Sequence, residues 1–174
     1  TSDTHFCHAN IIKYASRPFA SATEMDEALI ERWNAVVQPQ DHIYHLGDVT
    51  MLRSSADLWR IEAILRRLQG HKRLILGNHD HIDARWYRNY FQKVKASNML
   101  DGMLLTHYPV HPNSLGRARA NIHGHIHEKP LYPAVIVNDC KWTGKATKQD
   151  VDRLVPYVNV CVAVTNYTPV ALET

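Results

Sequence analysis

Apolar residues recur at helical spacing in two segments of the chain, 23–37 and 54–68. In the first segment Thr23 and Asp26 can form a capping pair, and the second begins with two serines and ends before Gly70. Each segment is therefore predicted to form an amphipathic helix that buries one face.

Shorter apolar or alternating runs lie between and after these segments, and Gly, Asp, Asn or Pro bounds each of them, which is typical of strands. Early helices between strands, followed by a strand-rich second half, predict an α/β (α+β) fold with helices packed outside the sheets. The polar and irregular residues 129–156 are predicted to be an excursion from a single domain that covers residues 1–174. The predicted strands are 42–46, 73–76, 103–106, 120–123, 134–137, 157–164 and 169–172.

The composition of the 174 residues, 45% hydrophobic and 21% charged, is that of an ordinary globular protein. The net charge of +3 is spread over segments of mixed sign and indicates no nucleic-acid partner, and no apolar run approaches the roughly 20 residues that span a bilayer. The three cysteines, Cys7, Cys140 and Cys161, form no Cys-x-x-Cys pair, so neither a disulfide framework nor a zinc ribbon is expected. A reducing, cytoplasmic setting without a membrane partner fits these features best.

Three histidines, His123, His125 and His127, stand at every second position of one short stretch. They would all face the same side of a straight, extended strand, as metal ligands do. Taken alone, the stretch is also compatible with a polar, solvated strand edge.

Other potential ligands follow the ends of further apolar runs. Each of them taken alone can be a turn residue or a structural histidine, but together they predict one site. The set has carboxylate, amide and imidazole donors and no thiolate, which suits Mn, Fe, Zn or Ni. Seven donors are too many for one tetrahedral ion and suit two ions that share a bridging carboxylate. The set is Asp3, His5, Asp48, Asn78, His107, His125 and His127.

These residues fall in five motifs, in the order Asp3-x-His5, Gly47-Asp48, Gly77-Asn78-His79-Asp80, His107 and Gly124-His125-x-His127. The series closely resembles the calcineurin-like metallophosphoesterase superfamily, in particular its small bacterial and phage members that begin Ser-Asp-Thr-His-Phe. The resemblance implies a four-layer αββα sandwich of two mixed β-sheets flanked by helices, of the metallo-dependent phosphatase type. It also implies that Asp3, His5 and His127 hold one ion, that Asn78, His107 and His125 hold the other, and that Asp48 bridges both. His123 is then a structural residue.

The resemblance also implies a reaction, the dinuclear-metal-dependent hydrolysis of phosphomonoesters or phosphodiesters, with a nucleotide or similar small molecule as the expected substrate. Two divalent ions, Mn first, clamp the phosphate and lower the pKa of a bound water, so that hydroxide is the nucleophile. In the family pattern His79 is the general acid for the leaving group, and Asp80 orients its ring.

The sequence leaves the substrate open. His8, Asn10, Arg17 and Arg117 lie in or near motif segments and are candidate contacts to the phosphate or leaving group, although each can equally be a surface residue. Action as a nuclease on DNA or RNA is the alternative activity. A metal-free interaction scaffold, known for a retromer subunit of similar fold, is less expected because all seven ligands are intact.

Two departures from the family pattern affect the predicted site. Cys7 stands where many relatives have glycine, so it either narrows the pocket and exposes it to oxidation or is a small buried apolar residue. Asp3 lies near the start of this sequence, so its part in a metal site depends on sheet pairing that holds the segment in place.

Overall fold

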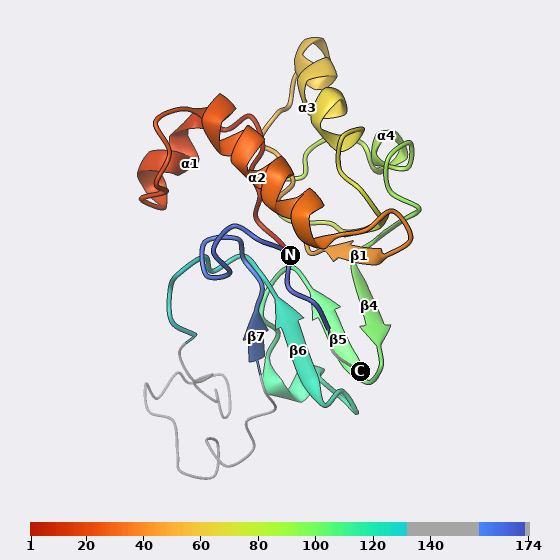
Figure 1. Cartoon of the computed structure of the whole chain (residues 1–174). Coiled ribbons are helices and arrows are strands. Elements are labelled where there is room, and N and C mark those ends of the chain that lie inside the picture. Colours follow the sequence, from red (N-terminus) through yellow and green to blue (C-terminus); the bar gives the residue numbers. More distant parts are fainter. Residues whose placement is uncertain (132–156, 173–174) are drawn as a thin grey trace.

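The computed structural model describes residues 1–131 and 157–172 of the chain (Figure 1). Its α-helices are α1 (Ala9–Tyr14), α2 (Ala22–Val36), α3 (Leu58–Leu65) and α4 (Ala84–Tyr87), with short 3-10 turns η1 (Ser55–Asp57) and η2 (Pro112–Ser114). Its strands are β1 (His42–His45), β2 (His71–Ile75), β3 (Lys93–Lys95), β4 (Ser97–Leu100), β5 (Met103–Thr106), β6 (Ala120–His123) and β7 (Tyr157–Asn159).

The strands form two sheets, as the α/β prediction requires. The first has the order β1-β2-β3 and is parallel, so the expectation that both sheets are mixed is wrong for this one. The second has the order β4-β5-β6-β7 and is mixed, because β4 runs antiparallel to β5 while β6 and β7 continue in parallel.

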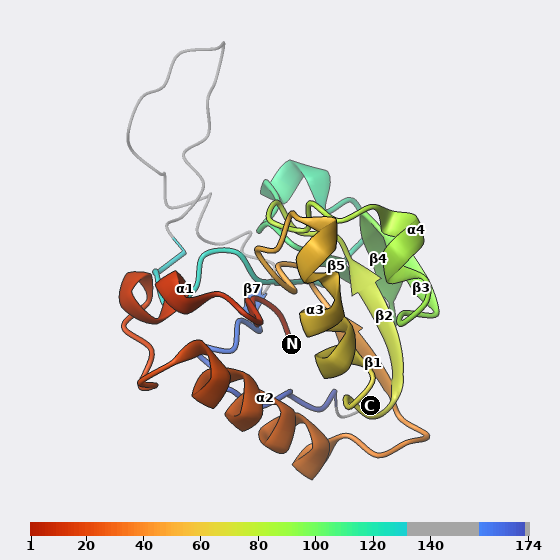
Figure 2. The same ribbon diagram turned by 90° about the horizontal axis from the view of Figure 1, so that it is seen from above.

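Side-chain alternation along β1 and β2 divides the interior into two apolar cores. Ile43 and Leu74 face the helices and pack in a core that contains Leu29 and Ile61. Ile75, together with Leu46 and Val160, faces the second sheet in a core with Leu105 and Ala120. The layers are therefore helices, first sheet and second sheet (Figure 1), and Figure 2 shows α3 between α2 and α4 when the helical layer is seen from above.

The loop after β5 covers the outer face of the second sheet, where a layer of helices was predicted. Asn121 is buried on this face, donates to the Leu104 carbonyl and accepts from the Val110 amide, while the Tyr157 hydroxyl donates to the Val110 carbonyl. All four described α-helices contribute to the core on the other side of the first sheet. In the described part of the chain the sandwich thus has three layers, since the loop after β5 takes the place of a fourth.

The predicted helices form, with different ends. The cap of α2 is Ser21, which accepts from the Glu24 amide at 3.1 Å, rather than Thr23 with Asp26. The second helix is shorter than predicted, because a 3-10 turn occupies 55–57 and the helix ends at Leu65. No described helix is long and apolar enough to cross a membrane.

The predicted strands are confirmed near 42–46 and 73–76 and at 103–106 and 120–123, and the prediction for 134–137 lies outside the described residues. The prediction for 157–164 is too long, because β7 ends at Asn159 and turns occupy 162–167, and the prediction for 169–172 is wrong, because these residues form no strand. The short elements α1, α4, β3 and β4 were not indicated by any periodicity.

Candidate metal centre

The segment of residues 2–6 runs between the ends of the two sheets. The Ser2 amide donates to the Val160 carbonyl at 3.0 Å, and the Asp3 amide donates to the Gly47 carbonyl at 2.9 Å. Further along, the His5 amide donates to the Asp48 carbonyl at 3.0 Å. Backbone pairing on both sides therefore holds Asp3 and His5 in place. Such pairing is what Asp3 was expected to need in order to act as a ligand.

Five of the seven predicted ligands have left-handed backbone conformations. This region is uncommon for residues other than glycine, although Asp, Asn and His tolerate it best, and each instance costs on the order of 1–3 kcal/mol. Such strain is typical of functional sites, where surrounding hydrogen bonds maintain it. The φ angles are 57° at Asp3, 51° at His5, 57° at Asp48, 70° at His125 and 51° at His127.

The left-handed residues change the reading of the histidine stretch. Strand β6 ends at His123, so His125 and His127 are not on one face of a straight strand as the spacing suggested. His123 is buried, with its ring 6.0 Å from that of Tyr157, and lies outside both ligand groups described next.

Two groups of three side chains converge after the strand ends. Their ligand atoms lie within 4.8 Å of one another inside each group, and each group can hold a metal ion. Asp48 faces both groups, because one carboxylate oxygen lies 3.6 Å from His5 Nε2 and the other 3.5 Å from His107 Nε2. The first group is Asp3, His5 and His127, and the second is Asp48, His107 and His125.

Ring nitrogens of His107 and His5 face the other donor atoms of the two groups. His107 Nδ1 lies 2.7 Å from the Leu46 carbonyl, which can only accept, so Nδ1 carries a proton and Nε2 is the nitrogen that faces the site. Asn78 Oδ1 lies 2.8 Å from that nitrogen, within hydrogen-bond distance, so Nε2 would release a proton when it binds a metal ion. Both ring nitrogens of buried His5 lack a hydrogen-bond partner among the described residues, which a bound ion would explain for one of them.

Burial and charge set protonation states that suit metal binding. Burial lowers the pKa of His5 to about 2, so its imidazole is neutral and available as a ligand. For Asp48, burial opposes ionisation, but the hydrogen bond and charge of His107 prevail and lower the pKa to about 2. The centre therefore combines a buried carboxylate anion with a neutral imidazole.

The motif glycines allow the loops to approach the ligands. A Cβ at Gly77 would lie 2.2 Å from an Asp48 carboxylate oxygen, and one at Gly124 would lie 2.3 Å from an Asp3 carboxylate oxygen. At Gly47, φ is +92° and a Cβ would lie 2.5 Å from the Gly77 amide nitrogen. No other residue fits these positions without displacing a ligand or its loop.

His79 and Asp80 have different surroundings from those predicted for an acid and its orienting partner. The His79 ring is partly exposed, with Nε2 4.0 Å from an Asp48 oxygen, so it borders the centre. The Asp80 carboxylate does not orient that ring. It accepts hydrogen bonds from the amides of Asp48, Val49 and Gly77 and from the Tyr87 hydroxyl, and thus ties the two ligand loops together.

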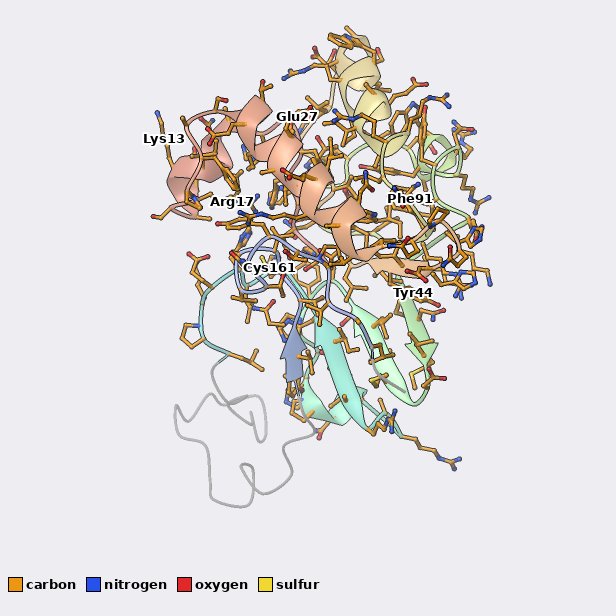
Figure 3. All side chains as sticks on the ribbon, in the orientation of Figure 1. Lys13, Arg17, Glu27, Tyr44, Phe91 and Cys161 are labelled. Atoms are coloured by element: carbon orange, nitrogen blue, oxygen red, sulfur yellow. The ribbon has the colours of Figure 1, made fainter. Side chains whose placement is uncertain are left out.

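Arg17 is a structural residue rather than the substrate contact that the sequence suggested. Its guanidinium is only 4% exposed and donates to the carbonyls of Asp3 and Thr4 at 2.7 and 2.8 Å. It also lies over the Tyr167 ring, between the segment that follows α1 and the residues after β7 (Figure 3). A buried cation used in this way fixes the strained ligand segment and leaves no surface for a phosphate.

The other three candidate substrate contacts differ in position. His8 borders the centre, with its ring 5.7 Å from that of His5, whereas Asn10 is an exposed residue of α1. Arg117 is exposed and precedes β6, beside the Arg119 amide that bonds to the Gly102 carbonyl in the β4–β5 turn. Because the ligands follow the other ends of β5 and β6, Arg117 lies at the wrong edge of the sheet to take part.

Two residues next to the ligands were not expected to contact them. The Cys161 sulfur lies 3.7 Å from His127 Nδ1, and the Tyr108 ring packs on His125 at a centroid distance of 4.3 Å. The signal for Tyr108 was its place directly after His107, whereas nothing in the sequence connects Cys161 with His127.

Cys7 is a small, partly buried apolar residue rather than a reactive thiol that narrows the pocket. It packs against the helical core and has φ +63°, a conformation that explains why glycine suits this position. Burial, with a further contribution from the Asp26 charge, raises the pKa of its thiol to about 12, so a reactive thiolate is not expected.

Comparison with known proteins places these residues in a wider group. The chain is 34% identical over 172 residues to the uncharacterized protein MJ1445 of Methanocaldococcus jannaschii, covering 99% of this chain and 85% of that protein. It is 30% identical over 158 residues to the gene 66 protein of Mycobacterium phage D29, covering 74% of this chain and 77% of the phage protein. The crystal structure of AQ665, a protein of unknown function from Aquifex aeolicus, superimposes with a TM-score of 0.66 at 27% identity, covering 97% and 91% of the two chains. No protein-family model matches the chain.

Proposed function

The chain belongs to the family of MJ1445 from Methanocaldococcus jannaschii and the gene 66 protein of Mycobacterium phage D29, and from its paired ligand groups we propose that it is a dinuclear-metal-dependent phosphoesterase. We place the family in the calcineurin-like metallophosphoesterase superfamily. The order of the five motifs and the pair of packed sheets support this assignment.

The observation that carries the proposal is the position of Asp48. Its carboxylate belongs to the second group through one oxygen and lies near His5 of the first group through the other, as a bridging ligand does in a two-metal site. The donors are imidazole nitrogens and carboxylate or amide oxygens, which suits manganese best, with iron, zinc or nickel as alternatives. Calcium fits less well, because it prefers six to eight oxygen ligands.

Two bound divalent cations supply the Lewis-acid chemistry, because they polarise a phosphoryl group and lower the pKa of water. The chain contributes the fixed geometry. Asp48 holds the two groups together, and Asp80 and Arg17 fix the loops that carry the ligands. His79 lies at the open side of Asp48 and is proposed to donate a proton to the leaving oxygen.

The proposal is tested by measuring metal content and hydrolysis together. Purified protein is assayed on phosphomonoesters, phosphodiesters and single-stranded DNA and RNA, after chelation and with Mn²⁺ or Ca²⁺ added back. Bound metal near two equivalents and restoration by Mn²⁺ but not Ca²⁺ are expected. Hydrolysis of nucleic acids alone would support the nuclease alternative, and no hydrolysis with both ions bound would refute the proposal.

The bridging carboxylate has a matched control. Asp48→Asn removes the charge that faces both groups, so activity should fall by roughly 100-fold or more, with weaker metal binding. Asp83→Asn removes an exposed carboxylate that, in the described part of the chain, pairs with Arg85 alone, and the activity of this variant should remain that of the wild type. Near-normal turnover of Asp48→Asn would contradict the two-metal assignment.

The role of His79 can be separated from metal binding. His79→Ala should keep both ions and lose roughly 10²–10⁴-fold in rate on a ribose-type ester, whose leaving oxygen needs a proton. The loss should be much smaller on a nitrophenyl ester, because nitrophenolate leaves without a proton. His71→Ala, at the start of β2, is the control. Equal losses on both esters would show that His79 stabilises the phosphoryl group electrostatically instead.

A further inference from the structure

Tyr108 is a half-exposed aromatic residue that packs directly on the second ligand group. Its ring lies 4.3 Å from that of His125 and 5.1 Å from that of His107, measured between centroids. Its carbonyl accepts from the Thr106 hydroxyl, which fixes the backbone at the start of the loop. Even so, Tyr108 is 48% exposed, whereas His107 is buried.

Support of the ligands does not account for this exposure. Tyr87 is the residue that supports a motif side chain here, since its hydroxyl donates to Asp80 and its ring is completely buried. Tyr108 makes no such hydrogen bond from its hydroxyl among the described residues. It therefore presents an aromatic surface, held in place by two imidazole rings, to whatever occupies the centre.

A flat aromatic ligand gains more binding free energy from contact with this surface than a flexible polar ligand does. A stacked ring loses its contact with water on one face, and Tyr108 loses little side-chain freedom because its neighbours already hold it. Nucleobases stack on such aromatic side chains without regard to sequence, because every base has a π-face. In a nucleotide, only the sugar separates that face from the phosphoryl group.

We propose that Tyr108 stacks on the nucleobase of a nucleoside phosphoester whose phosphoryl group is bound at the metal centre. This inference rests on the proposed phosphoesterase activity and narrows its substrate class. Tyr108 is thus a specificity-determining residue, which contributes to substrate binding and not to the chemical step.

Matched substrates that differ only in the base test the inference. The rates for adenosine 5′-monophosphate and ribose 5-phosphate, and for the methyl diester of each, are compared in the Mn²⁺-loaded protein. Tyr108→Leu should raise KM for the adenosine compounds by roughly 5- to 150-fold, the measured range for one stacked base, and leave the ribose compounds unchanged. Tyr108→Phe keeps the ring and should retain the wild-type preference.

The controls separate stacking from support of the ligands. Trp59→Ala removes another exposed aromatic side chain, one that lies on α3, and should leave KM unchanged for both the adenosine and the ribose compounds. Adenosine should inhibit the wild type competitively and inhibit Tyr108→Leu much less. Metal content is measured for every variant, because loss of an ion from Tyr108→Leu would identify a supporting role and overturn the inference.

The remaining outcomes distinguish the two proposals. If the wild type hydrolyses both substrate classes with the same KM and Tyr108→Leu changes neither, the stacking role is refuted while the phosphoesterase remains. An equal loss on both classes also refutes it. If the wild type hydrolyses none of the four compounds with its metals bound, the proposed function fails, and the substrate class fails with it.

Discussion

Gly124→Ala adds one methyl group at the point where the ligand loop after β6 crosses the segment of residues 2–6. The new Cβ would lie 2.2 Å from the Ser2 hydroxyl oxygen and 2.3 Å from an Asp3 carboxylate oxygen. Normal contacts between non-bonded heavy atoms are roughly 3.5 Å, so one of the two segments must move by about 1 Å. Gly124 itself does not have a positive φ, so the backbone accepts alanine without strain and the whole effect comes from the collision.

Two terms determine the change in stability. Overpacking a close contact costs roughly 1–3 kcal/mol, while the loss of backbone freedom in the unfolded chain returns roughly 0.4–1 kcal/mol. The free energy of unfolding should therefore fall by about 1–2 kcal/mol. The larger effect is on the first ligand group, because Asp3 must move away from His5 and His127, and affinity for one of two ions should fall by roughly 10- to 100-fold.

Titration calorimetry with Mn²⁺ and urea unfolding of the metal-free protein measure the two effects separately. Gly116→Ala is the matched control, because φ there is +56° and a Cβ would meet nothing within 4 Å. It should lose about 1–2 kcal/mol of stability through backbone strain alone and keep both ions. If Gly124→Ala binds two ions with unchanged affinity, the close packing of this loop on Asp3 cannot be what positions the carboxylate.

Two further changes test buried charged residues, Arg17 and Asp26. Arg17→Met leaves the buried carbonyls of Asp3 and Thr4 without their donor, so the free energy of unfolding should fall by about 3 kcal/mol or more. The affinity for Mn²⁺ should fall as well, and an unchanged affinity would contradict the positioning role of Arg17. Burial raises the pKa of Asp26 from 3.8 to about 6 despite its bonds from the Cys7 amide, so the folded protein keeps a proton that the unfolded chain releases between these pH values. Stability should fall as pH rises through that window, by roughly 2–3 kcal/mol in total, and Asp26→Asn should abolish this dependence in urea titrations at pH 4 and pH 7.

Four of the seven predicted ligands were recognisable because the fold brings the ends of separate strands close together. Asp48 follows β1, Asn78 follows β2, and His107 and His125 follow β5 and β6. Polar residues directly after apolar runs could therefore be expected to lie close together. The same reasoning failed for Arg117, which lies near the start of a strand rather than beyond its end. Sequence position relative to strand direction was therefore more informative than residue type.

The supporting residues could not be recognised in this way. Arg17 has a guanidinium group, which commonly binds phosphate. Only the burial of this group against two backbone carbonyls shows its structural role. Asp80 stands beside His79 in sequence, yet its carboxylate turns toward three backbone amides. In both cases the deciding fact is which backbone groups lack a partner, and that depends on how distant segments pack.

The left-handed ligands and the motif glycines are two parts of one geometric solution. At Asp3, His5, Asp48, His125 and His127 the positive φ turns the chain sharply, so that a short loop can aim its side chains inward. The turn brings backbone against backbone, and Gly47, Gly77 and Gly124 stand where a side chain would collide with a ligand or with the facing loop. Asp and His are among the residues that tolerate the left-handed region, so the chemistry of the donors and the shape of the loops favour the same residues. Strain at five ligands costs several kcal/mol in the metal-free protein. The hydrogen bonds of Arg17 and Asp80 maintain this strained conformation in the metal-free protein, so the proposed binding of two ions would not have to supply that strain energy.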